Sequence, residues 1–218
     1  MRALLRLIYP LLVAALLVAL PARAFAQPVG KATADFTNSR PGRAETPWGR
    51  LVCDAVRASG KADLCLINAG ALRQGTLNAG PVEAADIDAL LAFGDDEIVT
   101  LTLSGAQIRA ALERAASAYP TSSPAYLQCS GLTAKFDPTQ APGRRVGEIK
   151  IKEHAIGDQE TFTTAMPVSL SEGAAGYFNI WSGAQARKGG GTLRDSIAQY
   201  IRGKGEVSPE ETARFGPL

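Results

Sequence analysis

Two short stretches of the chain carry residue types that can bind a small ligand. The first, Asn68 to Arg73, follows the apolar run Leu64 to Ile67 and combines an amide, a glycine and an arginine. Gly70 permits close approach of the backbone, and a guanidinium can donate two parallel hydrogen bonds to a carboxylate or phosphate. The second, Phe93-Gly94-Asp95, offers an aromatic face, a turn residue and a carboxylate. From residue types alone, a strand-turn-helix crossover with a surface arginine and a core phenylalanine is the simpler explanation.

The residue types that autonomous hydrolysis requires are scarce in this sequence. A hydrolytic site with two metal ions needs several histidine and carboxylate ligands, whereas the chain has one histidine, His154, expected in an exposed turn. No Ser or Cys nucleophile has a histidine base, and no CxxC pair indicates zinc. We therefore expect no catalytic residue, no metal site and no cofactor, and no activity of the chain alone.

The first 26 residues have the pattern of a secretory signal peptide. Arg2 and Arg6 precede an apolar run from Leu7 to Leu20, and Ala24-Phe25-Ala26 forms a small-x-small cleavage site. The run is shorter than the ~20 residues that a spanning helix needs, so a membrane anchor is the less favoured alternative. We expect cleavage before Gln27, a periplasmic or secreted protein, and no membrane span after cleavage.

The remaining 192 of the 218 residues suit one domain, 27–218. Three of the 23 basic residues lie in the expected signal peptide, which leaves 20 basic and 21 acidic residues. This balance lacks the basic footprint of a nucleic-acid-binding protein. Three cysteines, Cys53, Cys65 and Cys129, are an odd set for an oxidising compartment. Two states of these cysteines remain as alternatives: buried free thiols, or a disulfide between Cys53 and Cys65.

Helices and strands alternate irregularly along the domain, which predicts an α+β fold. A strand is expected near 29–36, a helix from the Thr46 cap with Pro47 at its first position, and strands at 64–67 and 97–103. The sequence Ser104-Gly105-Ala106-Gln107 is a capping box that opens the next helix. Further strands are expected at 132–136, 146–152 and 161–166, followed by a flexible tract at 187–191. A last helix begins at Thr192 and ends at Gly203.

These motifs together resemble the C-terminal domain of the 5'-nucleotidase/UDP-sugar hydrolase family. That family has Asn-Gly-Gly-Gly-Ile-Arg after a strand and Pro-Phe-Gly-Asn after the next helix, where this chain has Asn68 to Arg73 and Phe93 to Asp95. The resemblance continues in family order through TPWGRLVCDAV (46–56), LTLSGAQIRAALE (101–113), LQCSGLTAKFDP (127–138), GAAGY (173–177) and TLRDSIAQYI (192–201). It implies a four-layer α/β/β/α sandwich with mixed sheets.

The resemblance also implies a ligand site, from which this chain departs in part. In the family, Asn and Arg contact the ligand, two Phe side chains sandwich the base, and an Asp binds the ribose. The implied ligand-binding residues here are Asn68, Gly70, Arg73, Phe93 and Asp95, the last replacing the usual Asn. The second Phe falls at Ser169 and the ribose Asp at Ala175. A further family Arg aligns near Ala44, and Arg40 and Arg43 are the two candidates to replace it. Tyr126, Tyr177 and Phe178 either reshape the pocket or pack in the core.

In the family, hydrolysis belongs to a separate metallophosphatase domain, which this chain lacks. The resemblance therefore implies a secreted module that recognises a nucleotide- or nucleoside-type ligand. It would act alone or with a separate metallophosphatase subunit in nucleotide catabolism. The alternative is a non-enzymatic scaffold or interaction domain with a degenerate ligand site.

Overall fold

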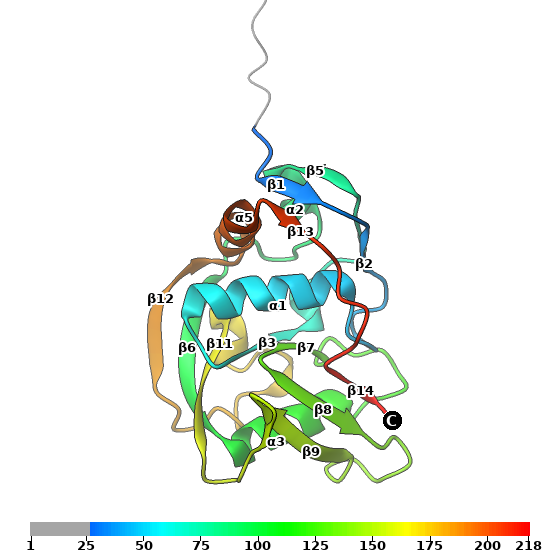
Figure 1. The fold of residues 1–218 in the computed structure, drawn as a ribbon. Coiled ribbons are helices and arrows are strands. Elements are labelled where there is room, and N and C mark those ends of the chain that lie inside the picture. Colours follow the sequence, from blue (N-terminus) through cyan, green and yellow to red (C-terminus); the bar gives the residue numbers. More distant parts are fainter. Residues whose placement is uncertain (1–26) are drawn as a thin grey trace, which may run out of the picture.

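A five-stranded mixed sheet forms the centre of the molecule (Figure 1). The computed structural model describes residues 27–218, so the expected signal peptide of residues 1–26 lies outside the described residues. Strand β11 pairs parallel with β3 and antiparallel with β6, while β7 pairs antiparallel with β3. The strand order is β12 (Ala186–Thr192), β6 (Glu97–Ser104), β11 (Thr161–Pro167), β3 (Leu64–Asn68) and β7 (Leu127–Ser130).

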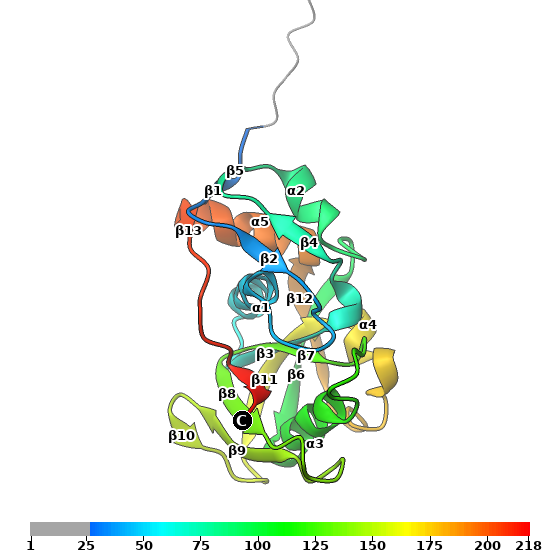
Figure 2. The same cartoon turned by 90° about the vertical axis from the view of Figure 1, so that its right-hand side faces the viewer.

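Two helices, α1 (Pro47–Gly60) and α5 (Leu193–Lys204), lie over one face of this sheet. Figure 2 shows α1 end-on, with α5 on one side and β3 and β7 on the other. Helix α1 begins as expected, because the Thr46 hydroxyl accepts a hydrogen bond from the amide of Gly49 at 3.0 Å. Its apolar face packs with β3 and α5 in one core cluster, which includes Val52, Val56, Cys65, Ile67, Ile197 and Ile201.

The other face of the central sheet packs against helix α3 (Gly105–Ala116) and a second sheet. The second sheet has the order β10 (His154–Ala155), β9 (Val146–Ile151), β8 (Leu132–Phe136) and β14 (Phe215–Pro217). The predicted capping box of α3 is present, with the Gln107 amide donating to the Ser104 hydroxyl at 3.2 Å and Gln107 Oε1 accepting from the Ser104 amide at 3.0 Å. Helices and mixed sheets pack in layers, which confirms the α+β fold.

Shorter elements complete the domain beyond α5. A three-stranded sheet joins β13 (Glu206–Val207), β1 (Gly30–Ala32) and β5 (Gly80–Val82), and β2 (Phe36–Asn38) pairs with β4 (Gly75–Leu77). The strand expected near 29–36 is therefore two short strands. Helices α2 (Ala84–Ala89) and α4 (Val168–Ser171) and the 3-10 turns Ala69–Ala71 and Ala174–Gly176 connect the larger elements.

Two predictions for the C-terminal part are wrong. The tract 187–191, expected to be flexible, belongs to strand β12, which pairs antiparallel with β6 and has a bulge between Lys188 and Thr192. Glycines disfavour a strand, but the backbone pairing with β6 overrides that preference at this sheet edge. Helix α5 continues past Gly203, and Gly205, at φ 73°, ends it because a positive φ suits glycine.

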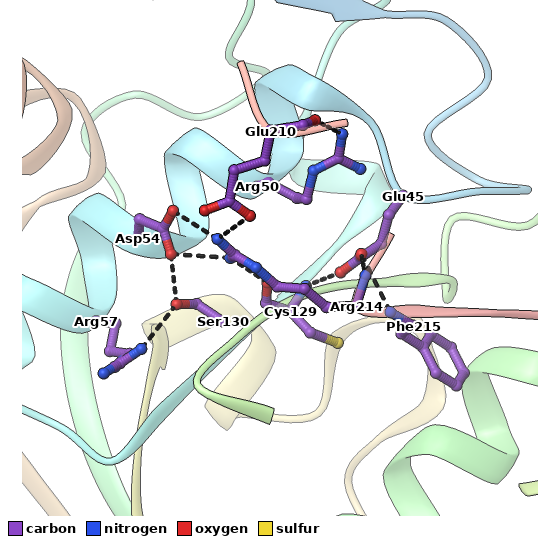
Figure 3. A network of polar contacts seen from close by, with 9 residues as sticks. All are labelled: Glu45, Arg50, Asp54, Arg57, Cys129, Ser130, Glu210, Arg214 and Phe215. Atoms are coloured by element: carbon purple, nitrogen blue, oxygen red, sulfur yellow. Dashed lines mark hydrogen bonds and ion pairs between the residues drawn. The ribbon is translucent and has the colours of Figure 1, made fainter. Parts of the chain in front are cut away.

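An ion pair fixes the C-terminal segment to helix α1 (Figure 3). The Arg214 guanidinium donates to both carboxylate oxygens of Asp54 at 2.8 Å and to Glu210 at 2.7 Å. The Asp54 carboxylate also accepts from the Ser130 hydroxyl at 2.5 Å. Burial alone lowers the pKa of Arg214, but the hydrogen bond and charge of Asp54 outweigh this effect, so its pKa is raised.

A buried glutamate holds the same segment from the other side (Figure 3). Glu45 accepts hydrogen bonds from the amides of Cys129 at 2.9 Å, Arg214 at 2.5 Å and Phe215 at 3.1 Å. Burial raises the pKa of Glu45, and these three donors oppose that rise. Since β14 pairs with β8, the network ties both sheets to α1.

The three cysteines are buried and unpaired in the structure. Cys53 and Cys65 lie in the core cluster on the α1 side of the central sheet, whereas Cys129 lies in the cluster on the opposite side. Burial raises the pKa of both Cys53 and Cys129. No helix within residues 27–218 is both long enough and apolar enough to cross a membrane.

Candidate ligand-binding cleft

The turn after β3 places Arg73 at the protein surface. The amides of Ala69 and Gly70 donate to the carbonyl oxygens of Tyr126 and Pro124, at 2.8 and 3.1 Å. The Arg73 amide donates to Leu90 O at 3.0 Å. These contacts fix the backbone of the turn, while the Arg73 side chain remains exposed.

The turn between α2 and β6 lies directly beside it. The Ala92 amide donates to Ala71 O at 2.9 Å, and Leu91 forms a bridge with Leu72. The Phe93 ring at the tip of this turn is 62% exposed, which is unusual for a large aromatic residue and leaves its face free for stacking. The two sequence motifs are therefore brought together by backbone hydrogen bonds.

A cleft of about 640 Å³ opens between these two turns and the starts of α4 and α5. This volume lies within the range of ~300–1,000 Å³ typical of small-molecule sites. Its floor and walls combine apolar atoms with five charged groups. The lining residues are Arg73, Asp88, Leu91, Ala92, Phe93, Gly94, Asp95, Asp96, Ser169 and Arg194.

Arg194, at the start of α5, is the centre of the charged groups in the cleft. Its Nη1 lies 2.9 Å from Asp95 Oδ1, and its Nε donates to Asp88 Oδ1. The hydrogen bond to Asp88, followed by the charges of Asp88 and Asp95, raises the pKa of Arg194. Asp96 Oδ1 instead accepts from the Ser169 amide at 3.4 Å. Within residues 27–218, Arg73 forms no ion pair.

Three of the five predicted ligand-binding residues line the cleft: Arg73, Phe93 and Asp95. The other two lie behind it. Asn68 is 6% exposed and donates through Nδ2 to Pro124 O at 3.2 Å. A Cβ on Gly70 would lie 3.0 Å from that same Nδ2 and 3.3 Å from Pro124 Cβ. Asn68 and Gly70 therefore support the turn that carries Arg73.

The positions at which this chain departs from the family pattern are now placed as well. Ser169 lines the cleft, whereas Ala175 does not, and its carbonyl accepts from Arg114 at 2.7 Å. Tyr126 and Tyr177 are core residues, 1% and 0% exposed, so neither reshapes the cleft. Phe178 is 71% exposed but is not among the lining residues.

Arg40 and Arg43 line a separate hollow of about 380 Å³, where the Arg43 guanidinium lies 5.9 Å from the Tyr119 ring centroid. A more enclosed hollow of about 150 Å³ beside α1 is smaller than typical ligand sites of ~300 Å³ and above. Among the described residues, no group of three or more His, Cys, Asp or Glu side chains is arranged to hold a metal ion.

Sequence reasoning missed Arg194, Asp88 and Asp96. The sequence shows Arg194 only as a polar residue in the first turn of a helix, about one hundred positions from its partners. A charge in that turn is no signal for a ligand site by itself. Only the packing of α5 on α2 and on the turn before β6 brings these residues together.

Comparisons with known proteins agree with this fold. The sequence profile described as "5'-nucleotidase, C-terminal domain" matches residues 28–181. A snake venom 5'-nucleotidase of Naja atra is 25% identical over 192 residues, covering 78% of this chain and 36% of its own length. The trifunctional nucleotide phosphoesterase YfkN of Bacillus subtilis is 29% identical over 181 residues, covering 78% of this chain and 12% of its own. The chain thus spans about a third or less of the length of these relatives.

Solved structures show the same fold. A 5'-nucleotidase precursor from Thermus thermophilus superposes with a TM-score of 0.82 at 23% identity, over 88% of this chain and 39% of its own. The NAD nucleotidase of Haemophilus influenzae gives a TM-score of 0.75 at 16% identity, over 88% of this chain and 38% of its own. At these identities the likeness establishes the fold alone.

Proposed function

Because the chain belongs to the family of 5'-nucleotidase C-terminal domains, we propose that it recognises a nucleotide- or nucleoside-type ligand in the cleft between Arg73 and Phe93. The observation that carries this proposal is the convergence of two motifs. Arg73, Phe93 and Asp95 come from turns that are separate in sequence and line one cleft of about 640 Å³.

The side chains supply the contacts that such a ligand needs. An aromatic base stacked on the exposed Phe93 ring gains about 1–3 kcal/mol. Hydrogen bonds from the Arg73 guanidinium to ligand oxygens contribute about 1.5–3 kcal/mol if those oxygens are charged. Leu91 and Ala92 add apolar surface at the base of the cleft.

Hydrolysis is proposed to require a second component. The relatives named as 5'-nucleotidases are about three times longer than the matched region, and the described residues offer no metal-binding cluster. We propose that any turnover depends on a separate metallophosphatase chain docked over Arg73 and Phe93. The expected signal peptide of residues 1–26 would place this chain in the periplasm or outside the cell, so the partner chain would have to be exported as well.

A non-enzymatic scaffold or interaction domain is the alternative function. Its support is the loss of two family contacts: Ser169 lines the cleft where a second aromatic ring is expected, and Ala175 offers no carboxylate for a ribose. Losing one stacked aromatic costs about 1–3 kcal/mol, so a ligand held by Phe93 alone binds up to ~100-fold more weakly.

The experiment that separates the two is a thermal-shift screen of the mature protein with nucleosides, nucleotides and sugar phosphates. Recognition predicts a concentration-dependent rise in melting temperature with at least one of these ligands, because binding to the native state stabilises it. Phe93→Ala should reduce that rise at the same ligand concentration, because it weakens binding by about 1–3 kcal/mol. A screen without any shift, supported by calorimetry, would favour the scaffold.

A further inference from the structure

The side chain of Arg73 depends on its backbone for its position in the cleft. It is exposed, and within residues 27–218 it forms no ion pair that would hold its guanidinium. Both polar groups of the backbone at this residue are fixed. The Arg73 amide donates to Leu90 O at 3.0 Å, and the Arg73 carbonyl oxygen accepts from Asn38 Nδ2 at 2.6 Å.

Asn38 lies where a short pair of strands ends (Figure 2). Strand β2 pairs antiparallel with β4, and Asn38 opposite Gly75 is the last pair at this end. Arg73 lies two residues before Gly75, so it is beyond the backbone pairing of the two strands. The Asn38 side chain therefore supplies the donor that β2 no longer offers to this carbonyl.

Hydrogen-bond chemistry fixes the direction of the Asn38 amide. Thr46 Oγ1 accepts from the Gly49 amide at 3.0 Å, so its own proton goes to Asn38 Oδ1, 2.6 Å away. The Arg73 carbonyl can only accept, so it requires the amide nitrogen of Asn38. The side chain is 0% exposed, and both of its ends are used. Because Thr46 caps α1, Asn38 connects the start of this helix to the backbone of Arg73.

The donor to Arg73 is what an asparagine adds at this position. An apolar residue of similar size would fill the same space in the core. It would leave the Arg73 carbonyl without a protein donor, and a carbonyl in that state turns toward water. The turn would then be held mainly through the Arg73 amide, and its side chain would take up more directions.

We infer that Asn38 is a positioning residue for ligand recognition, which holds the backbone of Arg73 so that its guanidinium is directed at the cleft before a ligand arrives. The inference rests on the proposed function. Immobilising one long side chain at the moment of binding lowers affinity by about three- to tenfold. Asn38 removes part of that loss, because it fixes the backbone of the turn in advance.

The test is calorimetric titration of AMP into the unmodified protein, Asn38→Leu, Arg73→Ala and the double variant. Leucine fills the space of the amide and removes its donor. Asn38→Leu should weaken the binding of AMP by about three- to tenfold. In the Arg73→Ala background it should change the affinity by less than about twofold, because a residue that acts through Arg73 has no effect once that side chain is removed.

Hydrogen exchange of the Arg73 amide gives a second measurement, which needs no ligand. This amide is bound to Leu90 O in the structure. In Asn38→Leu it should exchange about tenfold faster, because the lost hydrogen bond to the neighbouring carbonyl is worth about that factor.

Ser104→Ala is the matched control. It removes the hydroxyl that caps α3, a helix that packs in the core cluster on the opposite face of the central sheet. Both the AMP affinity and the exchange of the Arg73 amide should stay within about twofold of the unmodified protein, because the two sites share no partner. Thr46→Val is a second variant in case Asn38→Leu does not fold. It retains Asn38 but removes the hydroxyl that orients its amide, so it should change both measurements in the same direction by a smaller factor.

The outcomes separate this inference from the proposed function. Weaker AMP binding in Asn38→Leu that disappears in the Arg73→Ala background supports the inference. An equal loss in both backgrounds, or in Ser104→Ala, shows a general effect on the fold and overturns it. Loss of AMP binding in Arg73→Ala but not in Asn38→Leu also overturns it and leaves the proposed function intact. If the unmodified protein does not bind AMP, the proposed recognition of a nucleotide fails. An unchanged exchange rate of the Arg73 amide in Asn38→Leu would then show that Asn38 does not hold the turn either.

Discussion

Replacing Arg214 with methionine should destabilise the protein by about 3 kcal/mol, because the substitution leaves a partly buried carboxylate without its cation. The Arg214 and Asp54 side chains are 14% and 22% exposed, and two hydrogen bonds of 2.8 Å join them. Breaking a buried pair by removing one partner costs ~3–5 kcal/mol, and the residual exposure favours the lower end of that range. Methionine retains an unbranched apolar side chain like the stem of arginine but lacks the guanidinium, so the packing of that stem changes little.

Urea denaturation followed by circular dichroism measures the change in the free energy of unfolding. In a thermal melt, a loss of 3 kcal/mol corresponds to a melting temperature lower by about 6–12 °C for a domain of this size. Asp54→Asn in the Arg214→Met background should cost less than it does alone, since the double variant has no ion pair left to break. Arg202→Met, which changes an exposed arginine of α5, is the matched control and should fall within about 0.5 kcal/mol of the unmodified protein. A loss below about 1 kcal/mol for Arg214→Met, equal to that of the control, would show that the Asp54–Arg214 pair behaves as an exposed ion pair and contributes little to stability.

Three further predictions concern other parts of the molecule. The hydrogen bond from Lys152 is the main cause that lowers the pKa of Asp63 from 3.8 to about 2. Ionised Asp63 therefore stabilises the folded protein fully above pH 3.8, and this stabilisation is lost as the pH falls through about 2. Asp63→Asn should therefore flatten the acid side of the stability profile and cost about 1 kcal/mol at pH 7 after screening by water. Alkylation without reductant should label all three cysteines in denaturant and none of them rapidly in the native protein, because each is buried; fewer than three labels in denaturant would reveal a disulfide. A protein of residues 27–218 with added manganese, cobalt or zinc should release no phosphate from AMP above a buffer control, and turnover that co-purifies with it would reveal a catalytic site.

Local signals in the sequence predicted the elements whose ends are fixed by local chemistry. The Thr46 and Ser104 caps and the alternation of Leu132, Ala134 and Phe136 act within a few residues, and each is present as expected. Strand β12 was not predicted, because its glycine-rich sequence lacks a strand pattern and the strand forms through a long-range pairing with β6.

The residues that line the cleft were predicted only in part, because some follow local motifs and others depend on long-range packing. Arg73 and Phe93 follow local motifs, and the backbone contacts between their turns bring them together. The position of Arg194 in the cleft depends on the packing of α5 against residues that lie about one hundred positions earlier in the chain. Asn68 was expected at the ligand from the family resemblance; in the structure its amide donates to Pro124 O, and it is not among the residues that line the cleft.

The central claim is that the exposed ring of Phe93 stacks on a nucleoside-type ligand in the cleft. Calorimetric titration of adenosine into the unmodified protein and into Phe93→Ala tests this claim most directly. Phe178→Ala is the control, because Phe178 is the other exposed phenylalanine of the described residues and lies outside the cleft lining. We expect Phe93→Ala to weaken binding by about 1–3 kcal/mol and Phe178→Ala to leave it unchanged. Equal affinities in all three proteins, or a loss confined to Phe178→Ala, would contradict the claim.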